Sequence, residues 1–273
     1  MGPMERTTRK KLPVGGDSWV TVDVYGDPGA PGLVIVPGAM SDAHAWRRVA
    51  SAITAWPSVA VVNRRGRVPS GPLTGTYSLR TEVDDLGTVL DAFPGAPALF
   101  GWSYGGLIAL LAADARPLRQ VMAYEPVMPP FGSHALPELK AAEESEDRDA
   151  TVEIVSRKVA GLDAAHVEAM RADPRGWSVL RDLSRPAYAE LVALNAAVLP
   201  QGVALARRAG HVDLVIGEHS QGTAPYGTSF DTVRHHTPRH ATIHTLPGQS
   251  HMAHLQAPGQ LASLLDTLAR ETP

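Results

Sequence analysis

The sequence predicts an α/β protein built on a doubly wound, mostly parallel sheet with a helical insertion. Short, continuous apolar runs recur through the first half of the chain and alternate with segments of helical period. Such runs are typical of parallel strands that are buried on both faces, and their alternation with helices favours right-handed crossover connections. After about residue 132 this alternation gives way to helix-period segments without a convincing strand.

The first part of the chain is expected to open with an antiparallel hairpin. Residues 19–25 alternate apolar and polar side chains, as a half-buried strand does, and a Gly-Gly-Asp turn at 15–17 precedes them. Buried runs that end in turn signals follow, with a crossover helix over 45–55 between them. The strands predicted here lie at 7–12, 19–25, 33–36 and 59–62.

The middle of the chain continues the same order. Apolar residues at helical spacing follow Ser78, which can cap the first turn, and they predict a helix over 79–93. The elements predicted after it are a strand at 98–100, a helix at 104–114 and a strand at 119–124.

The change of pattern divides the chain into three parts. Residues 1–131 and 210–273 are predicted to form one α/β core, with residues 132–209 as a helical cap inserted into it. In the second core part, strands are expected at 212–216 and 241–246, before a closing amphipathic helix. Helix-period segments such as 149–160, 163–172 and 185–198 are expected to form helices of the cap.

Composition narrows the classes of partner. The net charge is −3 and no basic stripe is visible, so we expect neither nucleic acid nor a membrane surface as a partner. The absence of cysteine excludes disulfides and thiolate chemistry. The polar, basic N-terminus has no apolar run behind it, and no window is long and apolar enough for a membrane span. We therefore expect a cytoplasmic monomer or homodimer that acts on a small molecule.

The motif GWSYG at 101–105 supplies a candidate nucleophile. It matches G-x-S-x-G, in which glycines let the chain turn sharply from a strand into a helix and expose the serine hydroxyl. The motif alone is weak, because a short pattern often occurs by chance. Here a buried strand precedes it and a helix rich in small residues follows. The context favours Ser103 as a nucleophile over a merely structural glycine turn.

With this motif the sequence resembles the α/β-hydrolase family over nearly its whole length outside the insertion. The segment VIVPGA at 34–39 resembles the family's oxyanion loop, which implies the amides of Ala39 and Tyr104 as oxyanion donors. A plain turn that ends the strand is the alternative. The loop at 63–70 also resembles a family motif, but Asn63 and Val68 stand where Asp and Gly are usual.

The resemblance places the catalytic base at His251, in the sequence GQSH after the last predicted strand. His254 is the nearest competitor. The histidines at 235–236 and at 240 and 244 have no carboxylate that would complete a metal site, so we expect them to be solvated loop residues. Acyl transfer by a serine nucleophile requires neither a metal nor an organic cofactor, and we expect none.

The acid of the triad is expected in an unusual place. Most family members carry it after the strand equivalent to 212–216, where this chain has Ser220 instead. Glu125 ends the preceding strand, and this arrangement resembles some haloalkane dehalogenases and zearalenone-type lactone hydrolases. A buried carboxylate there could orient the base. Glu218 is the alternative acid, and a chain without an acid is the third possibility.

These residues predict acyl transfer to water through a covalent intermediate on Ser103. A serine at this position argues against dehalogenase and epoxide-hydrolase chemistry. The expected substrate is a small to medium hydrophobic ester or lactone. Rival functions are perhydrolase, carbon–carbon hydrolase, acyltransferase or tailoring chemistry on the same fold, and a ligand-binding protein without turnover. Candidate pocket residues are Met40, Trp102, Met128, Phe131, Trp177, Tyr188 and Met252.

Overall fold

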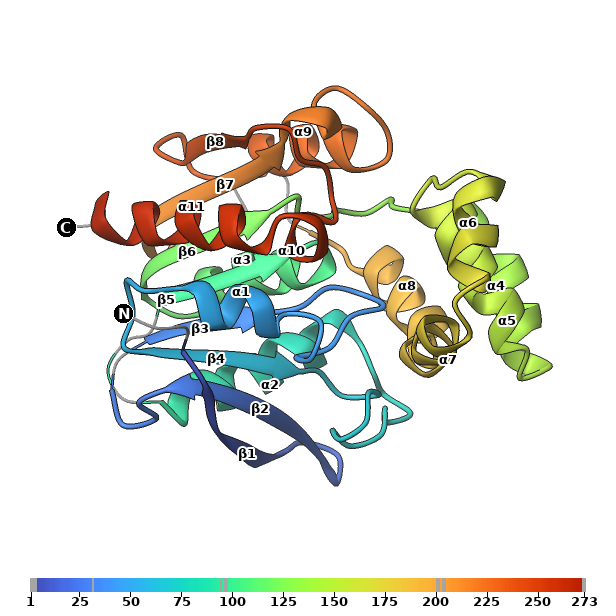
Figure 1. Ribbon diagram of the computed structural model, residues 1–273, viewed down its shortest axis with the longest axis horizontal. Coiled ribbons are helices and arrows are strands. Elements are labelled where there is room, and N and C mark those ends of the chain that lie inside the picture. Colours follow the sequence, from blue (N-terminus) through green and yellow to red (C-terminus); the bar gives the residue numbers. More distant parts are fainter. Residues whose placement is uncertain are drawn as a thin grey trace.

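A computed structural model describes residues 4–30, 32–93, 95, 98–199, 202 and 205–271. Its centre is an eight-stranded sheet with the order β1-β2-β4-β3-β5-β6-β7-β8 (Figure 1). The strands are β1 (Arg6–Val14), β2 (Ser18–Gly26), β3 (Gly32–Val36), β4 (Ser58–Asn63), β5 (Ala98–Trp102), β6 (Leu118–Tyr124), β7 (Ala209–Gly217) and β8 (Thr242–Leu246).

The sheet is mostly parallel, as predicted. β1 pairs with β2 and β2 with β4 in antiparallel fashion, whereas strands β3 to β8 all run in one direction. Their carboxyl ends therefore meet at one edge of the sheet. Trp102 at the end of β5 pairs with Tyr124 at the end of β6, so the residues that follow these two strands are neighbours.

Helices cover both faces of the sheet and bury two apolar cores. Successive residues of a strand point to opposite faces; thus Val34 and Val36 lie in one core, while Leu33 and Ile35 lie in the other. The first core is closed by α2 (Leu79–Asp91), α3 (Tyr104–Ala115) and α9 (Tyr226–His236). The second is closed by α1 (Arg47–Ala52), α10 (Ala253–Gln256) and α11 (Pro258–Glu271).

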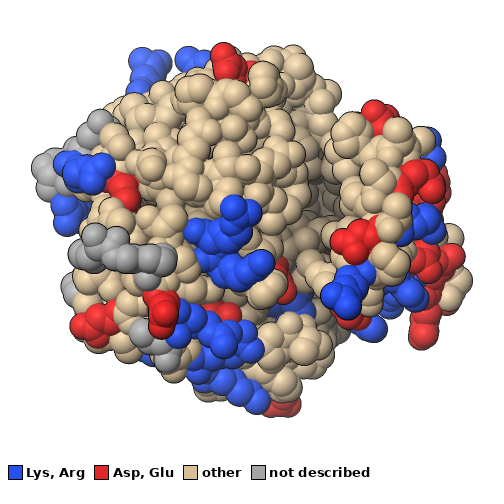
Figure 2. Space-filling model, viewed as in Figure 1, with Lys and Arg blue, Asp and Glu red and all other residues tan. Residues whose placement is uncertain are grey.

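A group of helices connects β6 to β7. It comprises α4 (Leu136–Glu144), α5 (Arg148–Ile154), α6 (Ala164–Arg171), α7 (Pro174–Leu183) and α8 (Ala187–Ala196). We call these five helices the cap. Figure 1 shows the cap at the end of the sheet where the parallel strands finish. Charged side chains gather on the cap, and a recess separates it from the core on the face shown in Figure 2.

The cap has a small apolar core of its own. Val152, Val167 and Trp177 are buried together, and Met40 of the main core packs against them. Aspartate side chains at the N-caps accept backbone hydrogen bonds at the starts of α5, α6 and α7. In the described part of residues 132–209, strand is confined to Ala209, where β7 begins.

Several elements differ from the sequence prediction. Helices α4, α7 and α10 lie outside the segments that were named as helices. The crossover helix expected over 45–55 is shorter, because α1 covers only Arg47–Ala52. Helix α9 was not predicted at all: its sequence is polar, and only a few positions such as Phe230 and Val233 are buried. Within the described residues, no helix has both the length and the apolar character needed to cross a membrane.

Candidate active site

Ser103 lies at the turn between β5 and α3. Its backbone has φ 58° and ψ −123°, a strained conformation for a residue other than glycine, and its side chain is largely buried. The Ser103 N–H donates to the Tyr124 carbonyl at 3.0 Å, which continues the β5–β6 pairing into the turn. A Cβ atom on Gly105 would lie 2.2 Å from the Val36 carbonyl oxygen, so only glycine permits this close packing.

The predicted oxyanion loop lies directly beside Ser103. A Cβ atom on Gly38 would come within 2.8 Å of the Ser103 Cβ, so the loop approaches the serine as closely as a glycine permits. The N–H groups of Ala39 and Tyr104 follow these two residues in the chain. Among the described residues, neither N–H donates a hydrogen bond to a backbone carbonyl. Both amides are therefore available to a bound oxygen atom.

His251 follows β8 and is held close to the end of β5. The indole N–H of Trp102 donates to the His251 carbonyl at 2.8 Å, and the two rings are 4.7 Å apart at their centroids. The Tyr124 hydroxyl fixes the preceding residue by donating to the Ser250 carbonyl at 2.5 Å. The predicted base and the predicted nucleophile therefore share one region at the carboxyl edge of the sheet.

Glu125 directly follows β6 and is fully buried. One carboxylate oxygen lies 2.7 Å from Nδ1 of His251, and the other accepts the Gly217 N–H at 2.9 Å. Its backbone φ of 41° is unusual for a residue other than glycine. A strained backbone that carries a buried carboxylate, with a hydrogen bond to each of its oxygens, is the kind of feature that clusters at functional sites.

The surroundings of His251 favour its neutral form. Burial lowers the pKa of His251 below its ordinary value, and the Glu125 carboxylate opposes this effect only in part. Because Nδ1 faces a carboxylate, it carries the hydrogen, which leaves Nε2 as the acceptor. A neutral imidazole with a free Nε2 is the state that a general base requires.

The alternative acid and base occupy other environments. Glu218 is exposed, and its carboxylate accepts the Gly248 N–H at 2.7 Å, so it fixes the loop between β8 and His251. His254 is buried between Trp46 and Trp102, with ring centroids 4.6 and 4.4 Å away. Burial lowers the pKa of His254 to about 3. Its Nδ1 atom has no hydrogen-bond partner among the described residues.

The structure adds Tyr226, which the sequence analysis did not single out. Its ring stacks on His251 with the centroids 3.4 Å apart and the planes inclined by 10°. The Phe131 ring also lies near Tyr226, with the centroids 5.8 Å apart and the planes inclined by 37°. Tyr226 begins α9, and the sequence signal that could have revealed this helix is the apolar spacing of Tyr226, Phe230 and Val233 after Pro225.

The predicted pocket residues separate into several groups. Trp102 and Phe131 lie beside the His251–Tyr226 pair, whereas Met40 and Trp177 meet in the apolar core of the cap. Tyr188 and Met252 pack at the margins of the two main cores. Met128 lines a groove of about 380 Å³ where the cap joins the core. The other lining residues are Pro129, Pro130, Asn195, Ala197, Leu199 and His236.

Two of the four histidines considered as metal ligands, His236 and His244, have other partners. His244 lies 2.9 Å from the Asp213 carboxylate, and His236 contacts the Gly202 carbonyl at 2.9 Å. In the described part of the chain, no group of three or more His, Asp or Glu side chains converges as metal ligands do.

The fold and this geometry define a hydrolase of the α/β type. The model of the alpha/beta hydrolase family matches residues 33–264, and the chain belongs to that family. No curated protein matches the sequence.

Solved structures with the same fold come from several bacteria. An alpha/beta hydrolase from Sphaerobacter thermophilus DSM 20745 has a TM-score of 0.75 at 22% identity, covering 94% of this chain and 99% of that one. The esterase RhEst1 from Rhodococcus sp. ECU1013 has a TM-score of 0.71 at 15% identity, with 98% and 100% covered. The enol-lactonase from Burkholderia xenovorans LB400 has a TM-score of 0.70 at 18% identity, with 95% and 99% covered. At these identities the likeness concerns the fold.

Proposed function

We propose that the protein hydrolyses a carboxylic ester or lactone of a small to medium hydrophobic compound through a Ser-His-Glu triad. The observation that carries this proposal is the buried Glu125 carboxylate against Nδ1 of His251, beside the strained turn that presents Ser103. The esterase and the enol-lactonase of the same fold support ester or lactone cleavage. The reaction as proposed needs no metal and no organic cofactor.

Each group has a defined part in the proposed reaction. The Ser103 hydroxyl attacks the carbonyl carbon while Nε2 of His251 takes its proton. The Ala39 and Tyr104 amides bind the oxyanion of the tetrahedral intermediate. The imidazolium then gives the proton to the leaving oxygen, and Glu125 stabilises this cation. A water molecule, which gives a proton to Nε2 of His251, then attacks the carbonyl carbon of the acyl-enzyme. The carboxylic acid product leaves, and the Ser103 oxygen takes the proton back from His251.

The ligand-binding protein without turnover is the rival from another class. Its main support in the sequence is Ser220, which stands where most family members carry the acid. The buried carboxylate of Glu125 at His251 weakens this support, because it supplies an acid from a different strand. A binding protein also has no need for a strained serine beside two unpaired amides.

Hydrolysis of graded substrates tests the proposal. We would measure initial rates on nitrophenyl esters of increasing chain length and on a panel of lactones, with Ser103→Ala as the blank. We expect turnover above the blank on at least one ester or lactone. Rates equal to the blank on all of them would overturn ester and lactone hydrolysis.

A further inference from the structure

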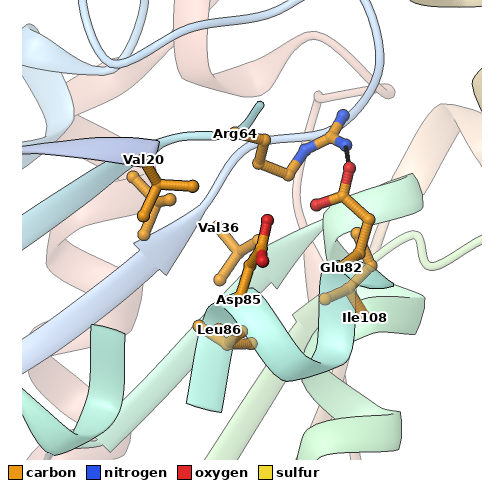
Figure 3. Close-up of a pocket in the computed structure, with 8 residues that line it drawn as sticks. Val20, Val36, Arg64, Glu82, Asp85, Leu86 and Ile108 are labelled. Carbon is orange, nitrogen blue, oxygen red and sulfur yellow. Dashed lines mark hydrogen bonds and ion pairs between the residues drawn. The ribbon is translucent and has the colours of Figure 1, made fainter. Parts of the chain in front are cut away.

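We propose that Arg64 is a positioning residue that orients the Ala39 oxyanion donor and that Glu190 links this orientation to the cap. This inference rests on the proposed function. Arg64 lies in the loop after β4 and is almost completely buried. Figure 3 shows its side chain reaching toward Glu82 of α2. A small cavity of about 10 Å³ lies beside this pair.

Arg64 holds the oxyanion loop by two hydrogen bonds. Its Nε donates to the Pro37 carbonyl and its Nη2 to the Gly38 carbonyl, both at 2.9 Å. The Gly38 carbonyl belongs to the same peptide group as the Ala39 N–H. Because a trans peptide is planar, its C=O and N–H point in opposite directions. A bond that fixes the Gly38 carbonyl therefore also fixes the direction of the Ala39 N–H.

The peptide group of the second predicted donor is fixed by backbone hydrogen bonds, although the Arg64 guanidinium also lies over the Tyr104 ring, 5.0 Å from its centroid. The Tyr104 N–H shares its peptide group with the Ser103 carbonyl, which accepts hydrogen bonds from Gly106, Leu107 and Val127 at 2.9, 3.2 and 3.3 Å. The Gly38 carbonyl accepts no backbone hydrogen bond among the described residues. The peptide group of the Tyr104 donor is thus held by three backbone N–H groups, and that of the Ala39 donor by the Arg64 side chain.

The charge of Arg64 is balanced by carboxylates from two parts of the molecule. Nη1 lies 2.6 Å from Glu82 of α2 and 2.7 Å from Glu190 of the cap helix α8. Burial tends to lower the pKa of Arg64, but Glu190 and Glu82 hold that pKa above its ordinary value. A buried ion pair is weak evidence for stability, since apolar side chains of equal volume serve as well. Orientation of the loop gives this costly arrangement a function.

Glu190 connects the cap to this arrangement. Its carboxylate also binds Arg67 through two bonds of 2.7 and 2.8 Å, and Arg64 and Arg67 together hold the pKa of Glu190 low although burial would raise it. Met40, the residue after Ala39, packs against the apolar core of the cap. The cap is thus linked to the oxyanion loop indirectly, by Glu190 of α8 through Arg64, and directly by Met40, so a shift of the cap would disturb the Ala39 donor.

The test compares Arg64→Lys with Arg65→Lys. Arg65 is the next residue in the same loop, equally buried and paired with Asp85 at 2.6 Å, but its backbone contact is Gly15 in the first hairpin. The measurements are kcat and KM on a nitrophenyl ester, the Ki of an alkyl boronic acid and the thermal transition. A boronic acid forms a tetrahedral adduct with the serine and so reports on the oxyanion donors.

We expect Arg64→Lys to lower kcat by about 10²-fold, the loss typical of one oxyanion donor. KM should stay within about threefold, and the boronic acid Ki should rise by roughly the same factor as kcat falls, because the lost contact acts in the transition state. Arg65→Lys should keep kcat and Ki within about threefold. Glu190→Gln, which retains an acceptor oxygen, should lower kcat and raise the boronic acid Ki by about tenfold each, with KM nearly unchanged.

Three results would overturn the inference. The first is an equal loss of kcat in Arg64→Lys and Arg65→Lys, which would mean a structural role for both. The second is a change in KM without a change in the boronic acid Ki. The third, decisive if Arg64→Lys fails to fold, is a Glu190→Gln enzyme with unchanged kcat and Ki. A wild-type protein that neither cleaves the ester nor binds the boronic acid would instead overturn the proposed function itself.

Discussion

The Glu125 carboxylate lies 2.7 Å from Nδ1 of His251, although the two residues are 126 positions apart in the sequence. Glu125 ends the strand next to that of Ser103, whereas Glu218 ends the strand beyond it and binds a loop amide. Substitutions of the two glutamates are therefore expected to have different effects on turnover. Only the one in contact with the imidazole can hold its tautomer and stabilise the imidazolium.

Substitutions at Glu125 and Glu218 distinguish the roles of the two residues in turnover. Glu125→Gln keeps the shape of the side chain but presents an amide to Nδ1, and we expect turnover to fall by about 10³–10⁴-fold. Glu218→Gln should stay within about tenfold, because the Glu218 carboxylate accepts the Gly248 N–H and is exposed away from the imidazole. Steady-state kinetics on one ester give the turnover of both variants and of the wild type. A nearly silent Glu125→Gln beside an inactive Glu218→Gln would assign the acid to Glu218.

The pH dependence of kcat/KM should report the environment of His251. The base must be neutral, and burial lowers the pKa of His251, so activity should persist at acid pH and decline only below the ordinary histidine value of about 6.5. Glu125 stabilises the imidazolium, so Glu125→Gln should move the acid limb to still lower pH. An acid limb above pH 6.5 in the wild-type enzyme would contradict this account of the site.

Tyr226 should support His251 through its ring rather than its hydroxyl. Tyr226→Phe keeps the stacked ring, and we expect kcat within about twofold of wild type. Tyr226→Leu removes a stacking contact that is typically about 0.5–1.5 kcal/mol, so kcat should fall roughly threefold to tenfold. Both variants are measured on the same ester. Equal activity of the two would mean that stacking on His251 has no part in turnover.

His254 should make the fold sensitive to acid. Its pKa of about 3 in the folded protein lies below that of the unfolded chain, so the unfolded state takes up a proton as pH falls below about 6.5. The stabilisation present above pH 6.5 is then lost toward pH 3, at up to roughly 1.4 kcal/mol per pH unit. Urea unfolding at pH 7 and pH 5 should show a smaller loss for His254→Phe than for wild type.

A matched variant controls for the loss of a histidine as such. His44 is exposed, and His44→Phe should retain the wild-type difference between the two pH values. If His254→Phe also retains it, the buried imidazole is not the source of the acid sensitivity.

The order of strands in the core, and of the helices α1, α2, α3 and α11, followed from the sequence. Strands such as β3 and β4 are continuous apolar runs, and α2 has a clear apolar stripe after the Ser78 cap. These signals are local and strong. Helix α9 was missed because its sequence is mostly polar and few of its positions are buried, so its apolar period is weak.

The motif residues were identifiable because each stands in a recognisable local context. Glu125 is a carboxylate at the end of an apolar strand, which is unusual without a polar partner. The link between Arg64 and Glu190 could not be read in this way, because it depends on how the cap meets the core. A lone glutamate within the apolar stretch of α8 was the only local signal.

Labelling with a fluorophosphonate tests the central claim, that Ser103 is a nucleophile activated by His251, most directly. We predict a single adduct by intact mass, located on the peptide that contains Ser103, absent from Ser103→Ala and formed much more slowly by His251→Ala. The thermal transitions of these variants should stay close to wild type, so that folding does not explain the loss. No adduct on the folded wild-type protein, or an adduct that persists in Ser103→Ala, would contradict the claim.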